Sequence, residues 1–285
     1  MAHTGHGGGH YWSDLRLHDE WDAMWMGHPR VRAWINRRVS GDPAMWPIGC
    51  LRRVVPERLP LTRVLSVGCG VGNLERSLLE LGLATEIVGV DESAEAVAEA
   101  ASRAAAAGFA ERVEYRVEDA RDTLARPARW DAVFFHASLH HFDRIGELLE
   151  RVREALKPKG ILYVDEYVGP SRDEWSLPRL ARLNLEYWRL PRESRRARLV
   201  RAPISREDPT EALQSSRIPG EVAARFRVLE RRDYGGNLLF VIYPNLRRPG
   251  DAFESAVSTL LRREDGLAEK GVPGYFSVIV AEREE

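Results

Sequence analysis

The sequence predicts an α/β fold, in which helices cover both faces of a mostly parallel sheet. Short apolar segments rich in β-branched residues alternate along the chain with longer segments that have the apolar periodicity of helices. The first of these apolar segments also runs directly into a glycine-rich turn and an amphipathic helix, over residues 63–75. A strand, a turn and a helix in this order form the repeating unit of a parallel sheet.

The glycine-rich turn predicts a cofactor site. Gly68, Gly70 and Gly72 occupy every second position. Glycine tolerates positive φ and leaves backbone N–H groups open to a ligand, while the following helix start adds partial positive charge. A dinucleotide fingerprint requires its third glycine at position 73, where this chain has Asn73. The spacing therefore counts against a dinucleotide.

Two later strand ends carry acidic residues that suit the same site. Residues 86–91 end in Asp91, which lies 23 positions after Gly68 and is followed by Glu92. A carboxylate at this strand end can accept hydrogen bonds from the two hydroxyls of a ribose, so Asp91 is predicted to bind ribose. Ser93 is predicted to cap the helix that follows. The next strand, over residues 112–118, leads into Asp119.

Residues 60–170 resemble the class I S-adenosylmethionine-dependent methyltransferases. The glycine turn resembles motif I of that family, Asp119 and Ala120 its adenine-contacting pair, and residues 131–141 the signature after its fourth strand. The resemblance implies a seven-stranded sheet with an antiparallel last strand, and strands near residues 63–67, 86–91, 112–118, 130–136, 161–167, 226–232 and 275–281. It also implies S-adenosylmethionine as cofactor, S-adenosylhomocysteine as product, and a cofactor site formed by Gly68, Cys69, Gly70, Gly72, Asn73, Asp91, Glu92, Asp119, Ala120 and His136.

The sequence departs from the family at motif I. Most members carry an acidic residue where this chain has Ser66, and that carboxylate helps to hold the ammonium group of the cofactor. In this chain, Glu75 or a water molecule is expected to bind the ammonium group in place of that carboxylate.

The predicted organisation is an N-terminal tail and helical cap over residues 1–60, followed by a methyltransferase domain over residues 61–285. We expect helical insertions after the fifth and sixth strands, at about residues 170–224 and 235–274. Their helices, near 177–190 and 251–265, are expected to cover the acceptor pocket. Residues 11–60 contain five of the eight tryptophans, which predicts packing on the main domain. Tyr11 and Trp12 are candidates to close the substrate pocket.

Composition narrows the choice of partners. The formal net charge of −1 gives no global attraction to nucleic acid or to an anionic membrane. No apolar run approaches the roughly 20 residues of a transmembrane helix, and the N-terminus lacks the apolar core of a signal peptide. We therefore expect a cytoplasmic protein with no membrane span and no nucleic-acid partner. The arginine-rich segment 189–206 is either a solvated helix face or a wall for an anionic substrate.

Methyl transfer from a sulfonium needs an aligned nucleophile and, for a hydroxyl acceptor, a proton acceptor. The candidates lie at the ends of the fourth and fifth strands and are His140, His141, Asp165, Glu166 and Tyr167. Of these, His140, His141 and Glu166 are expected in range of the acceptor, and His141 is preferred because histidine suits base catalysis near neutral pH. A metal bound by His136, His140 and Asp165 has no tight ligand spacing to support it, so no metal is predicted.

The predicted function is methyl transfer to oxygen or nitrogen of a small-molecule, natural-product or glycan acceptor. Two alternatives stay open on sequence alone. One is a nicotinamide-dependent oxidoreductase, and the other is a non-catalytic S-adenosylmethionine-binding protein.

Overall fold

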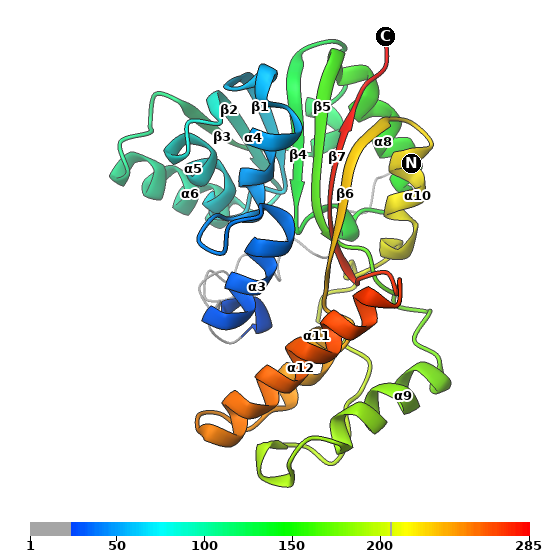
Figure 1. Ribbon diagram of the computed structural model, residues 1–285. Coiled ribbons are helices and arrows are strands. Elements are labelled where there is room, and N and C mark those ends of the chain that lie inside the picture. Colours follow the sequence, from blue (N-terminus) through cyan, green and yellow to red (C-terminus); the bar gives the residue numbers. More distant parts are fainter. Residues whose placement is uncertain (1–23, 206) are drawn as a thin grey trace.

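The computed structural model describes residues 24–205 and 207–285. They form one seven-stranded sheet with the strand order β3-β2-β1-β4-β5-β7-β6 (Figure 1). Strands β1 to β5 pair in parallel, whereas β7 runs antiparallel to both β5 and β6. The predicted fold class is therefore confirmed. The strands are β1 Leu61–Val67, β2 Ala84–Asp91, β3 Val113–Val117, β4 Trp130–His136, β5 Leu156–Tyr167, β6 Arg227–Gly235 and β7 Phe276–Glu282.

Strand β5 begins five residues earlier than residue 161, where the sequence placed its start. Leu156 already pairs with Trp130 of β4, and the register shifts between Trp130 and Ala132. Lys159 has a φ of +62°, so the chain makes its turn within the strand instead of before it. Residues 157–160 therefore belong to the strand and not to the connection before it.

Two apolar layers hold helices against the sheet because successive strand residues face opposite sides. In β1, Val64 belongs to one layer and Leu65 to the other. Helices α5 (Asn73–Glu80) and α6 (Ala94–Ala106) pack into the first layer. The second layer contains residues that flank or form α7 (Ala120–Thr123), α8 (Ile145–Ala155) and α10 (Ile218–Ala223).

The described part of the N-terminal segment packs on the first of these layers. Trp25, Val31, Ile35 and Leu51 are buried in the same cluster as residues of β1. Tyr11, Trp12 and the predicted tail lie outside the described residues. The elements of this segment are η2 Trp25–Gly27, α3 Pro29–Val39, η3 Pro47–Cys50, α4 Leu51–Val54 and η4 Pro56–Arg58.

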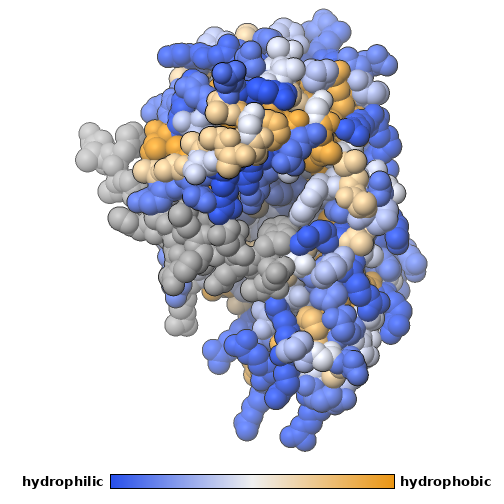
Figure 2. Space-filling model, turned by 90° about the vertical axis from the view of Figure 1, so that its left-hand side faces the viewer, coloured by the Kyte–Doolittle hydropathy of each residue, from blue (hydrophilic) through white to orange (hydrophobic). Residues whose placement is uncertain are grey.

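Both insertions contribute helices that extend beyond the carboxyl edge of the parallel strands (Figure 1). The first contains α9 (Leu177–Trp188), η6 (Arg192–Ser194) and η7 (Ser215–Arg217), and the second α11 (Leu239–Ile242), η8 (Tyr243–Asn245) and α12 (Asp251–Glu269). Figure 2 shows a hollow between the sheet-containing body and this helical part. No helix of the described residues is long and apolar enough to cross a bilayer.

Candidate active site

A cavity of about 330 Å³ lies where β1, β2 and β4 end. Its volume falls in the range of about 300–1,000 Å³ that is usual for small-molecule sites. The strand order changes direction beside β1, which is where open α/β sheets bind their ligands. The predicted site residues that line the cavity are Gly68, Cys69, Gly70, Asn73, Asp91, Glu92, Ala120, His136 and His141.

The glycine turn has the conformation that its sequence predicts. Gly68 and Gly72 have φ values of +68° and +74°. A Cβ atom on Gly68 would lie 2.5 Å from the Cβ of Ser138, whose hydroxyl donates a 2.6 Å hydrogen bond to the carbonyl of Val67. Gly72 does not line the cavity, and its missing side chain leaves room for the ring of Tyr115. Gly72 therefore shapes the turn, although the resemblance assigned it to ligand contact.

Asp91 connects the turn to the start of α6. Its Oδ2 accepts a 2.9 Å hydrogen bond from the backbone N–H of Gly70, and its Oδ1 accepts one of 2.9 Å from the N–H of Ser93. The hydroxyl of Ser93 in turn caps α6 through Ala96, as predicted. The carboxylate of Asp91 is thus fixed at the cavity wall, with its orientation set by two backbone donors.

The two acidic residues after β3, Glu118 and Asp119, make different contacts. Asp119 caps α7 by accepting a 2.7 Å hydrogen bond from the N–H of Arg121, and it does not line the cavity. Glu118, the residue before it, does line the cavity. Glu118 and Ala120, on either side of Asp119, thus border the cavity, and contact between Asp119 and an adenine stays a prediction.

Glu75 is a buried carboxylate that lines the cavity beside Ser66. Neither carboxylate oxygen has a hydrogen-bond partner among the described residues. Burial raises the pKa of Glu75, and the Ser66 hydroxyl only partly offsets this effect. An unpaired buried carboxylate is costly unless a ligand completes its contacts. The arrangement fits the ammonium group of an amino-acid-bearing cofactor.

The loop after β4 is held by Glu166 of β5. Its Oε1 accepts hydrogen bonds of 2.6 and 2.5 Å from the N–H groups of Ser138 and Leu139, and its Oε2 lies 2.5 Å from Nδ1 of His140. Glu166 is only 1% exposed and does not line the cavity. With these contacts made, Glu166 positions the loop and its histidines instead of meeting a substrate.

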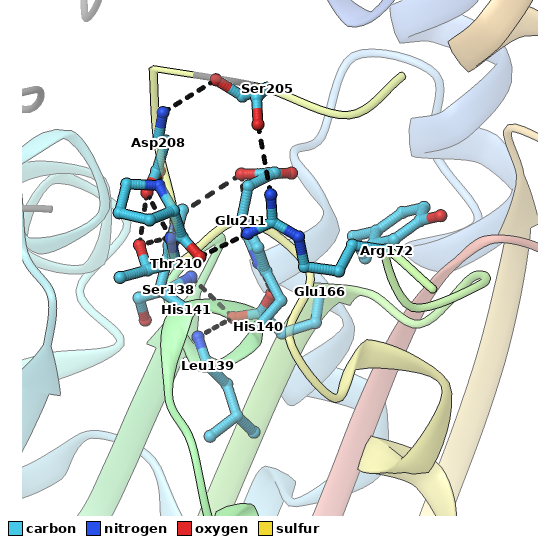
Figure 3. Close-up of polar contacts among 12 residues, drawn as sticks. Ser138, Leu139, His140, His141, Glu166, Arg172, Ser205, Asp208, Thr210 and Glu211 are labelled. Atoms are coloured by element: carbon cyan, nitrogen blue, oxygen red, sulfur yellow. Dashed lines mark hydrogen bonds and ion pairs between the residues drawn. The ribbon is translucent and has the colours of Figure 1, made fainter. Parts of the chain in front are cut away.

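Three residues of the first insertion complete the histidine cluster (Figure 3). Nδ1 of His141 lies 3.1 Å from Oγ1 of Thr210 and 3.4 Å from Oδ2 of Asp208. Oε2 of Glu211 lies 3.6 Å from Nε2 of His140 and 3.9 Å from Nε2 of His141. Thr210 and His141 line the cofactor cavity, whereas His140 does not. No motif in the sequence indicates these three insertion residues.

The charges in this cluster are strongly coupled. Burial alone would lower the pKa of His140, but the carboxylates of Glu166 and Glu211 outweigh it and raise that pKa to about 10. Burial and the nearby His140 lower the pKa of His141 to about 4. Burial also opposes the charge of Glu211, but the histidines outweigh it and lower its pKa to about 2. The shifts favour the charged form of His140 and the neutral form of His141.

The remaining predicted positions lie nearby. His136 at the end of β4 lines the cavity, and its Nδ1 lies 3.3 Å from Oδ2 of Asp165. The other oxygen of this carboxylate, Oδ1, accepts a 2.8 Å hydrogen bond from the hydroxyl of Tyr234. His140 faces Glu166 and Glu211 instead of this pair. The set considered for a metal on sequence alone is therefore divided between two clusters.

Comparison with known proteins agrees with this geometry. Residues 64–160 match a family model described as a methyltransferase domain. A ubiquinone biosynthesis O-methyltransferase of Azorhizobium caulinodans is 34% identical over 102 residues, which cover 36% of this chain and 39% of that protein. The enzyme of the same name from Xanthomonas euvesicatoria is 32% identical over 142 residues, covering 47% of this chain and 58% of the relative. Each match thus spans less than two thirds of the relative's own length.

Among solved structures, the fold resembles phosphoethanolamine N-methyltransferase 2 of Haemonchus contortus, solved in complex with S-adenosyl-L-methionine. The TM-score is 0.53 at 17% sequence identity, and the alignment covers 96% of this chain and 60% of the other. This similarity supports the fold. The matched domain, which contains the glycine turn and Asp91, agrees with the resemblance of residues 60–170 to the class I S-adenosylmethionine-dependent methyltransferases.

Proposed function

We propose that this protein transfers the methyl group of S-adenosylmethionine to a small-molecule acceptor, a class that includes natural products and glycans, at oxygen or nitrogen. The observation that carries the proposal is the single cavity wall that joins the glycine turn, Asp91 and Glu75 to His141. One part of this wall suits the cofactor, and the other presents a histidine where an acceptor would lie.

The cofactor part is assigned by the chemistry of its donors and acceptors. S-adenosylmethionine supplies a methyl group already activated on a positive sulfur. Asp91 would accept hydrogen bonds from the ribose hydroxyls, and Glu118 would accept one from the adenine amino group. Glu75 would accept hydrogen bonds from the ammonium group. The open backbone of Gly68 and Gly70 lets the amino-acid end lie close to the turn.

The acceptor part is formed by the histidine cluster. We assign to His141, His140 and Glu166 the task of promoting loss of the acceptor's proton, with His141 reaching the cavity and the other two holding it in place. A group that removes the acceptor's proton favours oxygen over nitrogen as the acceptor atom, because a hydroxyl becomes a good nucleophile only as its proton leaves. The two curated relatives are both named as O-methyltransferases, which supports the same choice.

The segment around Thr210 is proposed to cover the acceptor pocket. Neither α9 nor α12 contributes a residue to the lining of the cofactor cavity, although both lie beyond the predicted edge of the sheet. Thr210, by contrast, belongs to that lining. In the arginine-rich segment, Arg189 pairs with Glu186 at 2.6 Å, which favours a solvated face over an anion site for this residue.

The test is a binding and turnover experiment on the full chain. Calorimetric titration with S-adenosylmethionine should give one site, while NAD should give no heat of binding. Incubation with S-adenosylmethionine and a panel of hydroxylated small molecules should then yield S-adenosylhomocysteine with at least one acceptor. Binding without turnover across a broad panel would favour a non-catalytic cofactor-binding protein, and tight NAD binding would favour an oxidoreductase.

Asp91→Ala is expected to weaken S-adenosylmethionine binding by about 1.5–3 kcal/mol, the value of a hydrogen bond to a charged group. The loss has two sources, since Asp91 would bind the ribose and also accepts a hydrogen bond from Gly70 of the turn. Calorimetry measures it directly. Glu86→Ala, an exposed acidic residue on the same strand, is the matched control. Equal affinity of Asp91→Ala and the parent would show that Asp91 does not bind ribose.

A further inference from the structure

We propose that His140, His141 and Glu211 bind a divalent transition metal ion such as Zn²⁺ at the acceptor side of the cavity. One donor atom of each residue lies within 4.8 Å of the donor atoms of the other two. Two imidazoles and one carboxylate form a common set for catalytic zinc and for non-haem iron. Among the described residues this is the one group of three or more such side chains that is close enough to share an ion.

The distances suit a metal after a small contraction. Oε2 of Glu211 lies 3.6 Å from Nε2 of His140 and 3.9 Å from Nε2 of His141. Donors at about 2.0–2.2 Å from a tetrahedral zinc are about 3.3–3.5 Å apart. The two distances from Glu211 to the histidines exceed this donor spacing by only a few tenths of an ångström. The rings of His140 and His141 lie 4.1 Å apart and are tilted by 39°, so both approach Glu211 from one side.

The partners of the two histidines are those of a metal site. Nδ1 of His140 faces Glu166 at 2.5 Å, and Nδ1 of His141 faces Asp208 at 3.4 Å (Figure 3). Metal-binding histidines almost always direct their second nitrogen to a carboxylate or carbonyl, which fixes the ring and its tautomer. Here both histidines have such a carboxylate, and both turn the opposite nitrogen toward Glu211. A simple ion-pair network has no need of this repeated arrangement.

The charge of the cluster also favours a cation. Glu166, Asp208 and Glu211 are three carboxylates around two imidazoles, and Glu166 and Asp208 are each no more than 1% exposed. Arg172 also faces Glu211, but its hydrogen bonds go to the carbonyls of Pro209 and Ser205. A divalent ion would supply positive charge beside these three carboxylates.

The ion would give the proposed function its means of activating a hydroxyl, and in this respect the inference rests on that function. His141 is the one proposed ligand that lines the cavity, so the ion would lie behind this part of the cavity wall and would meet the acceptor beside His141. A divalent ion lowers the pKa of a hydroxyl that binds to it. The hydroxyl proton then passes to solvent water, the oxygen's electron pair forms the bond to the methyl carbon, and the pair of the broken carbon–sulfur bond stays on sulfur. The acceptor class is therefore a small molecule with a hydroxyl able to bind a metal.

The test is a titration of the chelator-treated full chain with Zn²⁺ alone, followed by calorimetry. His3, His6 and His10 of the N-terminal region should first be replaced by alanine in every protein compared, because they could bind Zn²⁺ themselves. We expect one equivalent of Zn²⁺ per chain. Glu211→Gln should weaken binding at least about tenfold and Asp208→Asn by about 10–100-fold. Glu207→Gln, an exposed acid in the same segment, should bind like the parent.

Thermal unfolding of each variant shows whether it is folded. Glu211→Asp keeps the charge but moves the carboxylate away from the histidines because its side chain is shorter, so it provides a second measure of metal ligation. Absence of stoichiometric Zn²⁺ binding by the parent, or equal binding by the parent and Glu211→Gln, overturns the metal site. Methyl transfer is read separately. A parent that takes up one Zn²⁺ but transfers no methyl group supports the metal site and contradicts the proposed function, whereas full turnover in excess chelator overturns the metal's role in catalysis.

Discussion

Replacing Glu75 with glutamine is expected to weaken S-adenosylmethionine binding by about 2–5 kcal/mol, or roughly 30- to 4,000-fold in the dissociation constant. The carboxylate is buried in the cavity wall and has no hydrogen-bond partner among the described residues. A cofactor ammonium would complete its contacts in a desolvated site, where charge pairing is strong. Glutamine keeps the shape of the side chain and removes the charge, so calorimetry measures the ion pair. Glu80→Gln, exposed at the end of the same helix, is the matched control.

The same substitution should stabilise the cofactor-free protein. An unpaired buried carboxylate opposes folding, and glutamine carries no charge to desolvate. Because burial raises the pKa of Glu75, the parent loses stability as the pH rises above the ordinary value for a glutamate, whereas Glu75→Gln should not show this loss. Denaturant unfolding with and without S-adenosylmethionine separates the two effects. If the variant binds S-adenosylmethionine as tightly as the parent, then water or Ser66, and not Glu75, binds the ammonium group.

Local chemistry explains why the turn and the sheet could be predicted from sequence. Gly68 and Gly72 need positive φ, and alternating apolar residues such as Val64 and Leu65 serve the two faces of one sheet. The spacing of these residues encodes their structure, so no distant contact is required to interpret it. The position of Asp91 beside the turn follows from the parallel pairing of β1 and β2.

The sequence pattern does not decide which of two adjacent acidic residues faces the cavity. Glu118 and Asp119 are neighbours of like charge, and only the helix cap formed by Asp119 shows that Glu118 is the residue left to line the cavity. The start of β5 depended similarly on the positive φ of Lys159. Neither feature has a signal in the pattern of apolar residues.

The histidine cluster could be predicted only in part because its members lie far apart in the chain. His140 and His141 follow β4, and Glu166 lies in the neighbouring strand, so sheet topology brings these three together. Asp208 and Glu211 belong to an insertion whose path no periodicity specifies. Their approach depends on tertiary contacts such as the 3.2 Å hydrogen bond from the N–H of Leu213 to the carbonyl of His140. The sequence shows that Asp208 and Glu211 are acidic residues of a long insertion, but it does not show that they lie beside the histidines.

His141→Ala is expected to lower methyl transfer by about 10²–10⁴-fold while leaving S-adenosylmethionine affinity nearly unchanged. His141 is the member of the cluster that lines the cavity, so its loss removes the group nearest the acceptor whether proton removal is direct or assisted by a metal ion. The cofactor contacts proposed for Asp91, Glu118 and Glu75 are left in place. Formation of S-adenosylhomocysteine with an acceptor found by screening measures the rate, and calorimetry measures cofactor binding.

The matched control for this substitution is His28→Ala. His28 is also buried and lies 3.2 Å from a carboxylate, that of Glu254, but it caps α3 and does not line the cavity. If both variants lose activity equally, the loss reflects general destabilisation. If His141→Ala abolishes cofactor binding, the histidine belongs to the cofactor part of the cavity, and full turnover would leave it only a packing role. A selective loss of turnover therefore requires that the acceptor's reacting atom lies beside His141, because the buried His140 and Glu166 cannot reach the cavity in its place.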